Sequence, residues 1–148
     1  MLHRTLVLNG PNLNLLGQRE PGIYGRTTLA EIEGMCRAAG ERLGLEVECR
    51  QSNGEGQLVS WVQEIPGHFA GLILNAGAYS HTSIALLDAL RALKEPLIEV
   101  HLSNIYQRET FRQHSYVSLA AKGVICGFGP RGYLMALDAL AAILNDAS

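Results

Sequence analysis

Five short apolar runs alternate with longer amphipathic segments along this 148-residue chain, and no other feature constrains its fold as strongly. Most of the runs are too continuous for a strand with one face in water, so they predict strands buried on both faces of a parallel sheet. The segments between them have apolar residues at helical spacing. The predicted strands cover residues 5–8, 45–50, 71–74, 97–100 and 124–126, and the predicted helices cover residues 29–43, 57–65, 83–93 and 133–144.

The helical segments have clear boundaries. Thr28 followed by Glu31 forms a capping box before the first helix, and prolines stop the second and the third. Residues 103–121 are less periodic and predict one short helix over 105–114. Right-handed crossovers in such a strand–helix alternation place helices on both faces of the sheet. We therefore expect a single domain over residues 1–148, a flavodoxin-like, doubly wound, five-stranded parallel sheet in three α/β/α layers.

Charge and hydropathy exclude several classes of protein. The net charge is −2, the pI is near 6.2 and the twelve basic residues form no run, so we expect neither a nucleic-acid nor a membrane partner. The apolar run at residues 6–8 is too short for a signal-peptide core or a membrane span, which predicts a soluble, unprocessed protein. Charged residues make up only 18% of the chain. That is below the usual ~25%, so we expect a homo-oligomer with large apolar contacts.

Cysteine usage indicates the compartment. Cys36, Cys49 and Cys126 are an odd number without CxxC spacing, and each lies in an apolar periodic segment. They are therefore expected to be reduced core thiols, which suits the cytoplasm.

The segment after the first strand, residues 9–25, is the first candidate for chemistry, because ligands of doubly wound sheets bind beyond the carboxyl ends of the strands. It holds two prolines, four glycines and three asparagines, so we expect neither strand nor helix in it, but an active-site lid. It also carries Arg19 and Tyr24. A tyrosine with a pKa of ~10 is only about 0.1% ionised at pH 7, and nearby arginines would make it a base. The alternative is that both are ordinary loop residues.

Glu99 and His101 are two residues apart at the end of the fourth strand, so their side chains share one face of the sheet. A carboxylate beside an imidazole favours the imidazolium, the form that donates a proton. The pair is therefore a candidate general acid. A structural buried ion pair is the competing interpretation.

Arg108 and Arg112 are four residues apart, which would place them on one face of the short helix over 105–114, with Glu109 off that face. The backbone amides of Leu102 and Ser103 lie in the same segment. Together these groups could hold a carboxylate or hydroxyls, although solvated surface arginines are the alternative.

Polar side chains also follow the third strand. Asn75, Ser80, His81 and Thr82 can hydrogen-bond a polyol, but Asn and Ser at a helix entry are also common caps.

Other chemistries have little support in the sequence. The GxGxxG pattern at residues 127–132 lacks the second strand and acidic residue of a dinucleotide site, so we interpret it as a glycine turn for close packing of the last helix. There is no P-loop, no GxSxG elbow and no HxH or HExxH spacing, so no metal site is predicted. Lys94 and Lys122, the only lysines, fall at the amino edge of the sheet, away from a Schiff-base position.

Long segments of the chain closely resemble the type II 3-dehydroquinate dehydratases, or type II dehydroquinases. The resemblance covers nearly the whole chain in the family's order, so chance agreement is excluded. The matching segments are NGPNLNLLGQREPGIYG at 9–25, ILNAGAYSHTS at 73–83, EVHLSNIYQRETFR at 99–112, HSYVS at 114–118 and GVICGFGPRGY at 123–133.

The resemblance implies a cofactor-free anti elimination of water from 3-dehydroquinate to 3-dehydroshikimate, through an enolate, in the shikimate or quinate pathway. It implies Tyr24 as the base with Arg19 lowering its pKa, Asn12 holding a water against the enolate oxygen, and His101 as the acid oriented by Glu99. The remaining implied site residues are Leu102 and Ser103 for the substrate carboxylate, Asn75, His81 and Arg112 for its hydroxyls, Arg108 as support for Tyr24, and Asp88 from a neighbouring subunit of a dodecamer built from trimers.

Two rivals from other classes remain to be weighed. A non-catalytic flavodoxin-like module that binds a small polyhydroxy acid would most plausibly lack Tyr24, Arg19 or His101, and all three are present. An NAD-linked oxidoreductase is opposed by the truncated glycine-rich unit.

Overall fold

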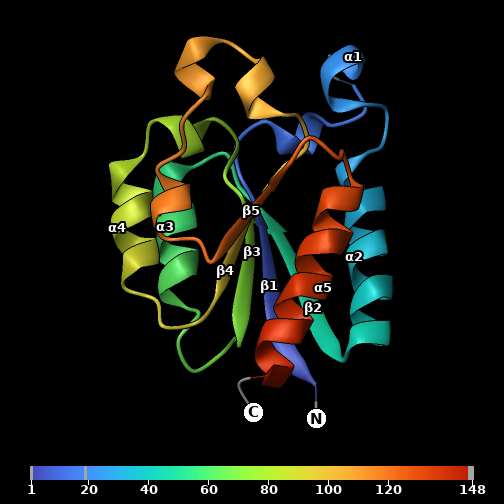
Figure 1. Ribbon diagram of the computed structural model, residues 1–148, viewed down its shortest axis with the longest axis vertical. Helices are drawn as coiled ribbons and strands as arrows, with labels where there is room; N and C mark the ends of the chain where they lie inside the picture. Colours follow the sequence, from blue (N-terminus) through green and yellow to red (C-terminus); the bar gives the residue numbers. More distant parts are fainter. Residues whose placement is uncertain (1, 19, 147–148) are drawn as a thin grey trace.

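The computed structural model describes residues 2–18 and 20–146, except for the side chains of residues 21 and 24. Five parallel strands form one sheet in the order β2-β1-β3-β4-β5, which confirms the predicted doubly wound arrangement (Figure 1). The strands are β1 (His3–Asn9), β2 (Leu45–Gln51), β3 (Gly71–Asn75), β4 (Leu97–His101) and β5 (Gly123–Cys126).

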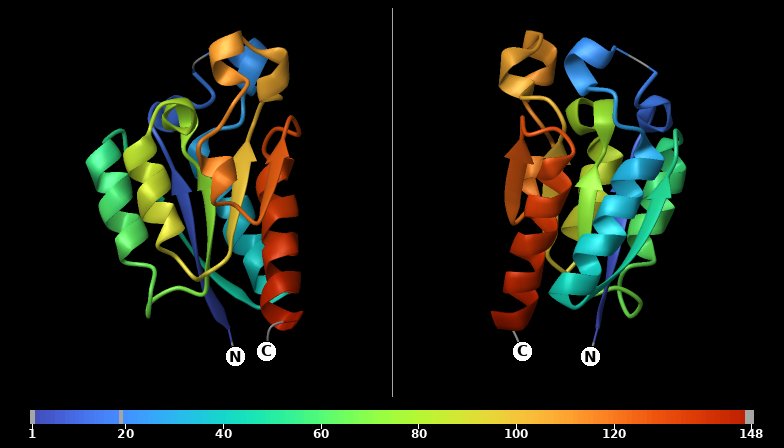
Figure 2. Two further views of the ribbon diagram at one scale, coloured as in Figure 1. Left: turned by 60° about the vertical axis from the view of Figure 1, so that its left-hand side comes forward. Right: turned by 90° about the vertical axis from the view of Figure 1, so that its right-hand side faces the viewer.

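Helices cover both faces of the sheet, as expected for right-handed crossovers. Helices α2 (Leu29–Leu43) and α5 (Arg131–Asp146) pack together on one face, and α3 (Glu55–Gln63) and α4 (Ile84–Arg91) pack together on the other (Figures 1 and 2). The start of β1 and the end of α5 lie at the amino edge of the sheet. The carboxyl edge carries the one-turn helix α1 (Pro21–Tyr24) and short 3-10 turns.

Local sequence signals account for the helix boundaries. The Thr28 hydroxyl accepts from the Glu31 N–H while the Glu31 carboxylate accepts from the Thr28 N–H, so the predicted capping box is present and α2 has the predicted bounds. Gly44 ends α2 with a left-handed φ of 75°. The Ser83 hydroxyl caps α4 by accepting from the Leu86 N–H at 2.9 Å.

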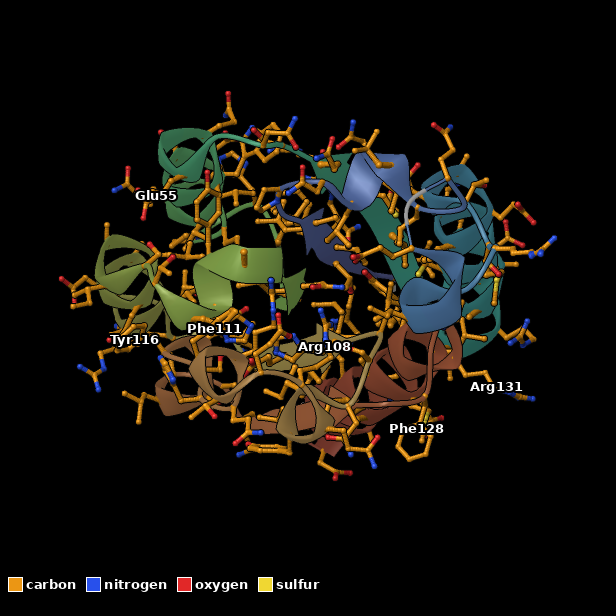
Figure 3. All side chains as sticks on the ribbon, turned by 90° about the horizontal axis from the view of Figure 1, so that it is seen from above. Glu55, Arg108, Phe111, Tyr116, Phe128 and Arg131 are labelled. Carbon is orange, nitrogen blue, oxygen red and sulfur yellow. The ribbon has the colours of Figure 1, made fainter. Side chains whose placement is uncertain are left out.

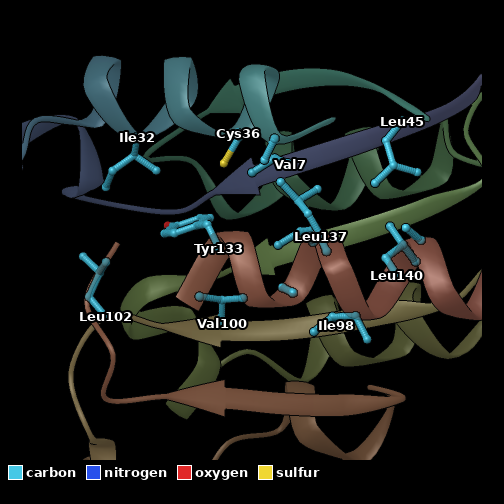
Figure 4. Close-up of a cluster of buried hydrophobic side chains, with 14 of the residues drawn as sticks. Val7, Ile32, Cys36, Leu45, Ile98, Val100, Leu102, Tyr133, Leu137 and Leu140 are labelled. Carbon is cyan, nitrogen blue, oxygen red and sulfur yellow. The ribbon is translucent and has the colours of Figure 1, made fainter. Parts of the chain in front are cut away.

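Two apolar cores lie on opposite faces of the sheet. One joins α2 and α5 to the sheet through residues such as Val7, Cys36, Val100 and Leu137 (Figure 4). The other lies under α3 and α4. All residues of β3 and β4 are buried, whereas the edge strands β2 and β5 are mostly half-buried. The prediction of fully buried strands therefore holds for the centre of the sheet. It fails at the edges because an edge strand lacks a neighbour on one side.

Two local predictions were wrong. Residues 9–25 do contain helical turns, a 3-10 helix at Leu13–Leu15 and α1, since a proline suits the first position of a helix. Residues 105–114 form two 3-10 turns, Ile105–Gln107 and Thr110–Arg112, in place of one helix. The chain is extended at Arg108, with φ −101° and ψ −171°, and this separates the turns.

Candidate active site

A cavity of about 170 Å³ opens at the carboxyl edge of the sheet. Seen from above, Arg108 lies near the middle of the molecule, while Phe128 and Arg131 lie at its periphery (Figure 3). The cavity brings together eight of the residues predicted for the site, from segments that follow three different strands. These are Asn12, Asn75, His81, His101, Leu102, Ser103, Arg108 and Arg112.

His101 lines this cavity, and the Glu99 side chain is buried next to it. Glu99 is fully buried, and His101 Nε2 lies 2.5 Å from its Oε2 oxygen. Burial raises the pKa of the Glu99 carboxyl, but the hydrogen bond and charge of His101, together with two serine hydroxyls, outweigh burial and lower it below its usual value. The carboxylate is thus held ionised. The imidazole can carry a proton at Nδ1, since Nε2–H donates to Glu99.

Sequence reasoning did not assign roles to the two serines that complete the Glu99 environment. Ser115 Oγ donates to Glu99 Oε2 at 2.6 Å, and Ser118 Oγ donates to Oε1 at 2.5 Å. Both belong to the matching segment at 114–118, which was the available signal. Three donors to a buried carboxylate offset much of the cost of its burial.

The surroundings of His81 lower the pKa of its imidazole. Burial lowers the pKa of His81, the charges of His101 and Arg112 lower it further, and only the hydrogen bond to the His114 carbonyl acts in the opposite direction. Nδ1–H donates to that carbonyl at 2.6 Å, so Nε2 is the acceptor nitrogen. The His81 and His101 rings stack with centroids 6.2 Å apart. The cavity therefore has one histidine suited to accept and one suited to donate.

Asn75 contributes an amide to the floor of the cavity. Its Oδ1 accepts from the Gly77 N–H at 3.2 Å, and its Nδ2 donates to the phenol of Tyr133 at 3.0 Å. The same phenol donates to Asn9 Oδ1 at 2.5 Å. Asn9 belongs to the candidate segment 9–25 but had no role predicted from the sequence, and Tyr133 was missed as a neighbour of the site.

Arg108 and Arg112 line the cavity, but not from one face of a helix as predicted. They do not share a helix face, and Glu109 lies between them, 3.5 Å from Arg108 Nε and 3.3 Å from Arg112 Nε. The prediction that Glu109 lies off their face was therefore wrong. Arg108 also donates from a terminal nitrogen to Ser103 Oγ at 3.1 Å. A shared carboxylate holds both cations at the rim, where an anionic ligand can meet them.

Asn12 stands at the opposite wall in a left-handed conformation, with φ 68°. Its N–H donates to Asn53 Oδ1 at 3.0 Å. Asn tolerates this backbone conformation better than most residues, which explains its place at the entry to the 3-10 turn.

Four predicted site residues are not among the described residues that line the cavity. One is Glu99, which is buried and contacts the lining residue His101. Arg19 lies outside the described residues, and of Tyr24 only the backbone at the end of α1 is described. Asp88 is exposed on α4 and lines a separate groove of about 400 Å³ between α3 and α4. Within one chain, the structure does not bring Asp88 to the site.

The glycine-rich segment at residues 127–132 forms the turn between β5 and α5. Gly127 and Gly129 have φ values of 96° and 60°, in the region that favours glycine, whereas a Cβ on Gly132 would be in ordinary contact with Val100 at 3.4 Å. Within residues 2–18 and 20–146, no group of three or more His, Cys, Asp or Glu side chains could hold a metal ion. No helix in the same ranges is long and apolar enough to span a membrane.

Comparison with known families decides among the remaining possibilities. A family model described as dehydroquinase class II matches residues 3–141. The chain belongs to the class II dehydroquinase family. It is 62% identical over 140 residues to 3-dehydroquinate dehydratase 1 of Agrobacterium fabrum, covering 95% of this chain and 97% of that one. It is 55% identical to the 3-dehydroquinate dehydratase of Variovorax paradoxus, covering 94% of this chain and 99% of that one.

Solved structures agree with the family assignment. The type II dehydroquinase of Propionibacterium acnes superposes with a TM-score of 0.92 at 46% identity, covering 96% of this chain and 98% of that one. A receiver domain of a Pseudomonas aeruginosa sensor histidine kinase, at 10% identity and a TM-score of 0.55, shares the fold alone.

Proposed function

We propose that this chain is a 3-dehydroquinate dehydratase, a hydro-lyase that removes water from 3-dehydroquinate to give 3-dehydroshikimate in the shikimate or quinate pathway. The observation that carries the proposal is the buried Glu99–His101 pair, which opens on a cavity lined by two arginines and neutral hydrogen-bonding groups. The relatives from Agrobacterium fabrum and Variovorax paradoxus are 3-dehydroquinate dehydratases. We propose an anti elimination that needs no cofactor and uses residues 1–148 as one catalytic domain.

The acid half of the reaction falls to His101. As the bond between carbon and the departing hydroxyl breaks, that oxygen takes the proton from His101 and leaves as water. Glu99 holds the imidazole in place and stabilises its charge, as its three hydrogen bonds and its lowered pKa favour the ionised carboxylate.

The base half falls to Tyr24. As tyrosinate it removes a proton alpha to the ketone, and the electron pair of the broken C–H bond passes into an enolate. Arg19 and Arg108 would stabilise the tyrosinate. Lowering the pKa of a tyrosine by three units takes ~4 kcal/mol, and one cation at ~5 Å in an effective dielectric of ~20 contributes ~3 kcal/mol, so two cations are enough. Asn12 would hold a water against the enolate oxygen.

Binding of the substrate uses the rest of the cavity. The backbone of Leu102 and Ser103 would take the carboxylate, since the segment after β4 turns directly into the cavity. Asn75, His81 and Arg112 would hold hydroxyls. A neutral His81 with a free Nε2 suits this task, because it accepts a hydrogen bond from a hydroxyl without competing for the catalytic proton.

We further propose a homododecamer, a tetramer of trimers, in which Asp88 reaches a neighbouring site. Its exposed position on α4, outside the chain's own cavity, supports a role across an interface. Exposed apolar side chains such as Phe111, Leu119 and Phe128, each at least 60% exposed, supply surface for such contacts.

The three free cysteines support a reducing compartment, the cytoplasm.

The direct test is addition of 3-dehydroquinate to EDTA-treated protein, with the conjugated enone of the product followed in the ultraviolet. Turnover that is unchanged by EDTA is expected. Binding of 3-dehydroquinate without product, seen as thermal stabilisation alone, would favour the non-catalytic binding module. Absence of both would overturn the proposal.

A further inference from the structure

Three polar side chains from three separate elements form a buried chain beneath the cavity floor. Asn9 ends β1, Asn75 ends β3 and Tyr133 lies in the first turn of α5. Their exposed fractions are 0%, 3% and 0%. Figure 4 shows the Tyr133 ring between α5 and α2, near Ile32 and Cys36, with its oxygen directed to the side on which Leu102 lies. Of the three, only Asn75 lines the cavity.

The Gly77 backbone N–H fixes the donor and the acceptor of each hydrogen bond between Asn75, Tyr133 and Asn9. The Gly77 N–H can only donate, so the atom of Asn75 that faces it at 3.2 Å is the amide oxygen. The amide nitrogen of Asn75 therefore faces Tyr133 and donates to the phenol oxygen at 3.0 Å. The phenol has one proton, and it goes to Asn9 Oδ1 at 2.5 Å. A single orientation of both amides satisfies all these contacts.

We propose that Tyr133 is a positioning residue of the substrate site, which locks the Asn75 amide so that its second N–H is presented to a substrate hydroxyl. The inference rests on the proposed function. The phenol suits the task because it both accepts from Asn75 and donates to Asn9. Within the described residues, this is the hydrogen bond that holds the Asn9 side chain, since its amide nitrogen is buried without a partner. Burial raises the pKa of the Tyr133 hydroxyl, so the proton that orders the chain stays in place over the working pH range.

The first variant is Tyr133→Phe, which removes the hydroxyl and keeps the ring that fills the core between α2 and α5. Asn75 Nδ2 then has no buried acceptor, and its amide is free to rotate away from the productive orientation. The substrate and the transition state lose the same contact, so we expect KM to rise about 10-fold while kcat stays within about 3-fold. Substrate should also stabilise the variant less against heat.

A matched control separates positioning from stability. Leu140→Ala, in the same helix and fully buried, creates a cavity far from the polar chain and lowers the thermal midpoint. Its KM should equal that of the wild type. If Leu140→Ala raises KM as much as Tyr133→Phe does, loss of stability explains both and the inference is overturned.

A second variant, at Asn9, tests whether the Tyr133 phenol must donate its proton away from Asn75. Asn9→Ala removes the acceptor of the phenol proton without touching the cavity lining, so the proton can turn toward Asn75 and compete with its N–H. We expect KM to rise about 3-fold, and the double variant with Tyr133→Phe to be no worse than Tyr133→Phe alone. If the increases in KM of the two single variants multiply in the double variant, the two residues act independently and the inference is overturned.

The outcomes also separate this inference from the proposed function. A wild-type protein that does not turn over 3-dehydroquinate refutes the function. An active wild type with wild-type KM in both folded variants refutes the positioning role alone. If Tyr133→Phe does not fold, Asn9→Ala decides, and failure of both to fold would show that the chain serves folding and contradict the inference.

Discussion

The two walls of the cavity are built on different principles. On one side, Glu99 and His101 end a fully buried central strand, and the Glu99 carboxylate is surrounded by three hydrogen-bond donors. On the other side, the chain from Asn12 to α1 is mostly exposed, and a backbone N–H of Asn12 anchors it to Asn53. The proposed acid is therefore held by the buried core of the fold. The proposed base sits on a surface segment, as expected for a lid that admits substrate.

The largest expected effect comes from the surface wall. Tyr24→Phe deletes the proposed base and little else, so kcat should fall about 10³-fold or more with KM nearly unchanged. Steady-state kinetics on 3-dehydroquinate measures both constants. Tyr106→Phe, an exposed tyrosine, is the control and should behave as the wild type. A wild-type kcat in Tyr24→Phe would sink the mechanism.

The buried wall should respond almost as strongly. His101→Ala removes the proposed acid, and we expect a loss of about 10²-fold to 10³-fold in kcat with a small change in KM. If KM changed and kcat did not, His101 would bind the substrate and would not protonate the leaving group.

A third, smaller effect on kcat should come from Glu99→Gln, because an amide no longer stabilises the imidazolium. A lost hydrogen bond between charged groups corresponds to about 10-fold to 100-fold in kcat.

The same variant has a signature in stability. The pKa of the Glu99 carboxyl is lowered in the folded state, so its contribution to stability is present above its ordinary pKa of 4.5 and is lost as the pH falls through the lowered value. The thermal midpoint of Glu99→Gln should therefore fall less than that of the wild type between pH 6 and strongly acidic pH. The exposed Glu46→Gln is the control and should follow the wild type. Parallel curves for Glu99→Gln and wild type would contradict the ionised, buried carboxylate.

The smallest effect is expected at Asp88, which belongs to neither wall of its own chain. Asp88→Asn should raise KM about 3-fold if the carboxylate completes a neighbouring site, and Asp138→Asn, exposed on α5, should leave KM unchanged. Light scattering on the wild type gives the independent check. A stable, fully active monomer at micromolar concentration would refute both the assembly and the role of Asp88.

The sequence predicts the buried wall well because it depends on regular structure. Alternation along a strand places Glu99 and His101 on one face, and β4 has this geometry. Helical spacing failed for Arg108 and Arg112, because the chain is extended at Arg108 and Glu109 bridges both arginines. Their arrival in the cavity depends on tertiary contacts that spacing does not encode.

The polar chain beneath the floor could not be predicted from local patterns. Asn75 and Tyr133 are 58 positions apart, and Asn9 and Tyr133 are 124 positions apart. Tyr133 lies in an apolar helical segment, where a tyrosine is usually a core residue. Its polar role appears only when α5 is packed against the ends of β1 and β3.

Solvent exchange at the substrate tests the division between the two walls most directly. With 3-dehydroquinate in D₂O, proton NMR follows deuterium entering the carbon alpha to the ketone. His101→Ala should retain this exchange while losing water elimination, because its base is intact, whereas Tyr24→Phe should lose both. Exchange that persists in Tyr24→Phe and disappears in His101→Ala would contradict the assignment of base and acid.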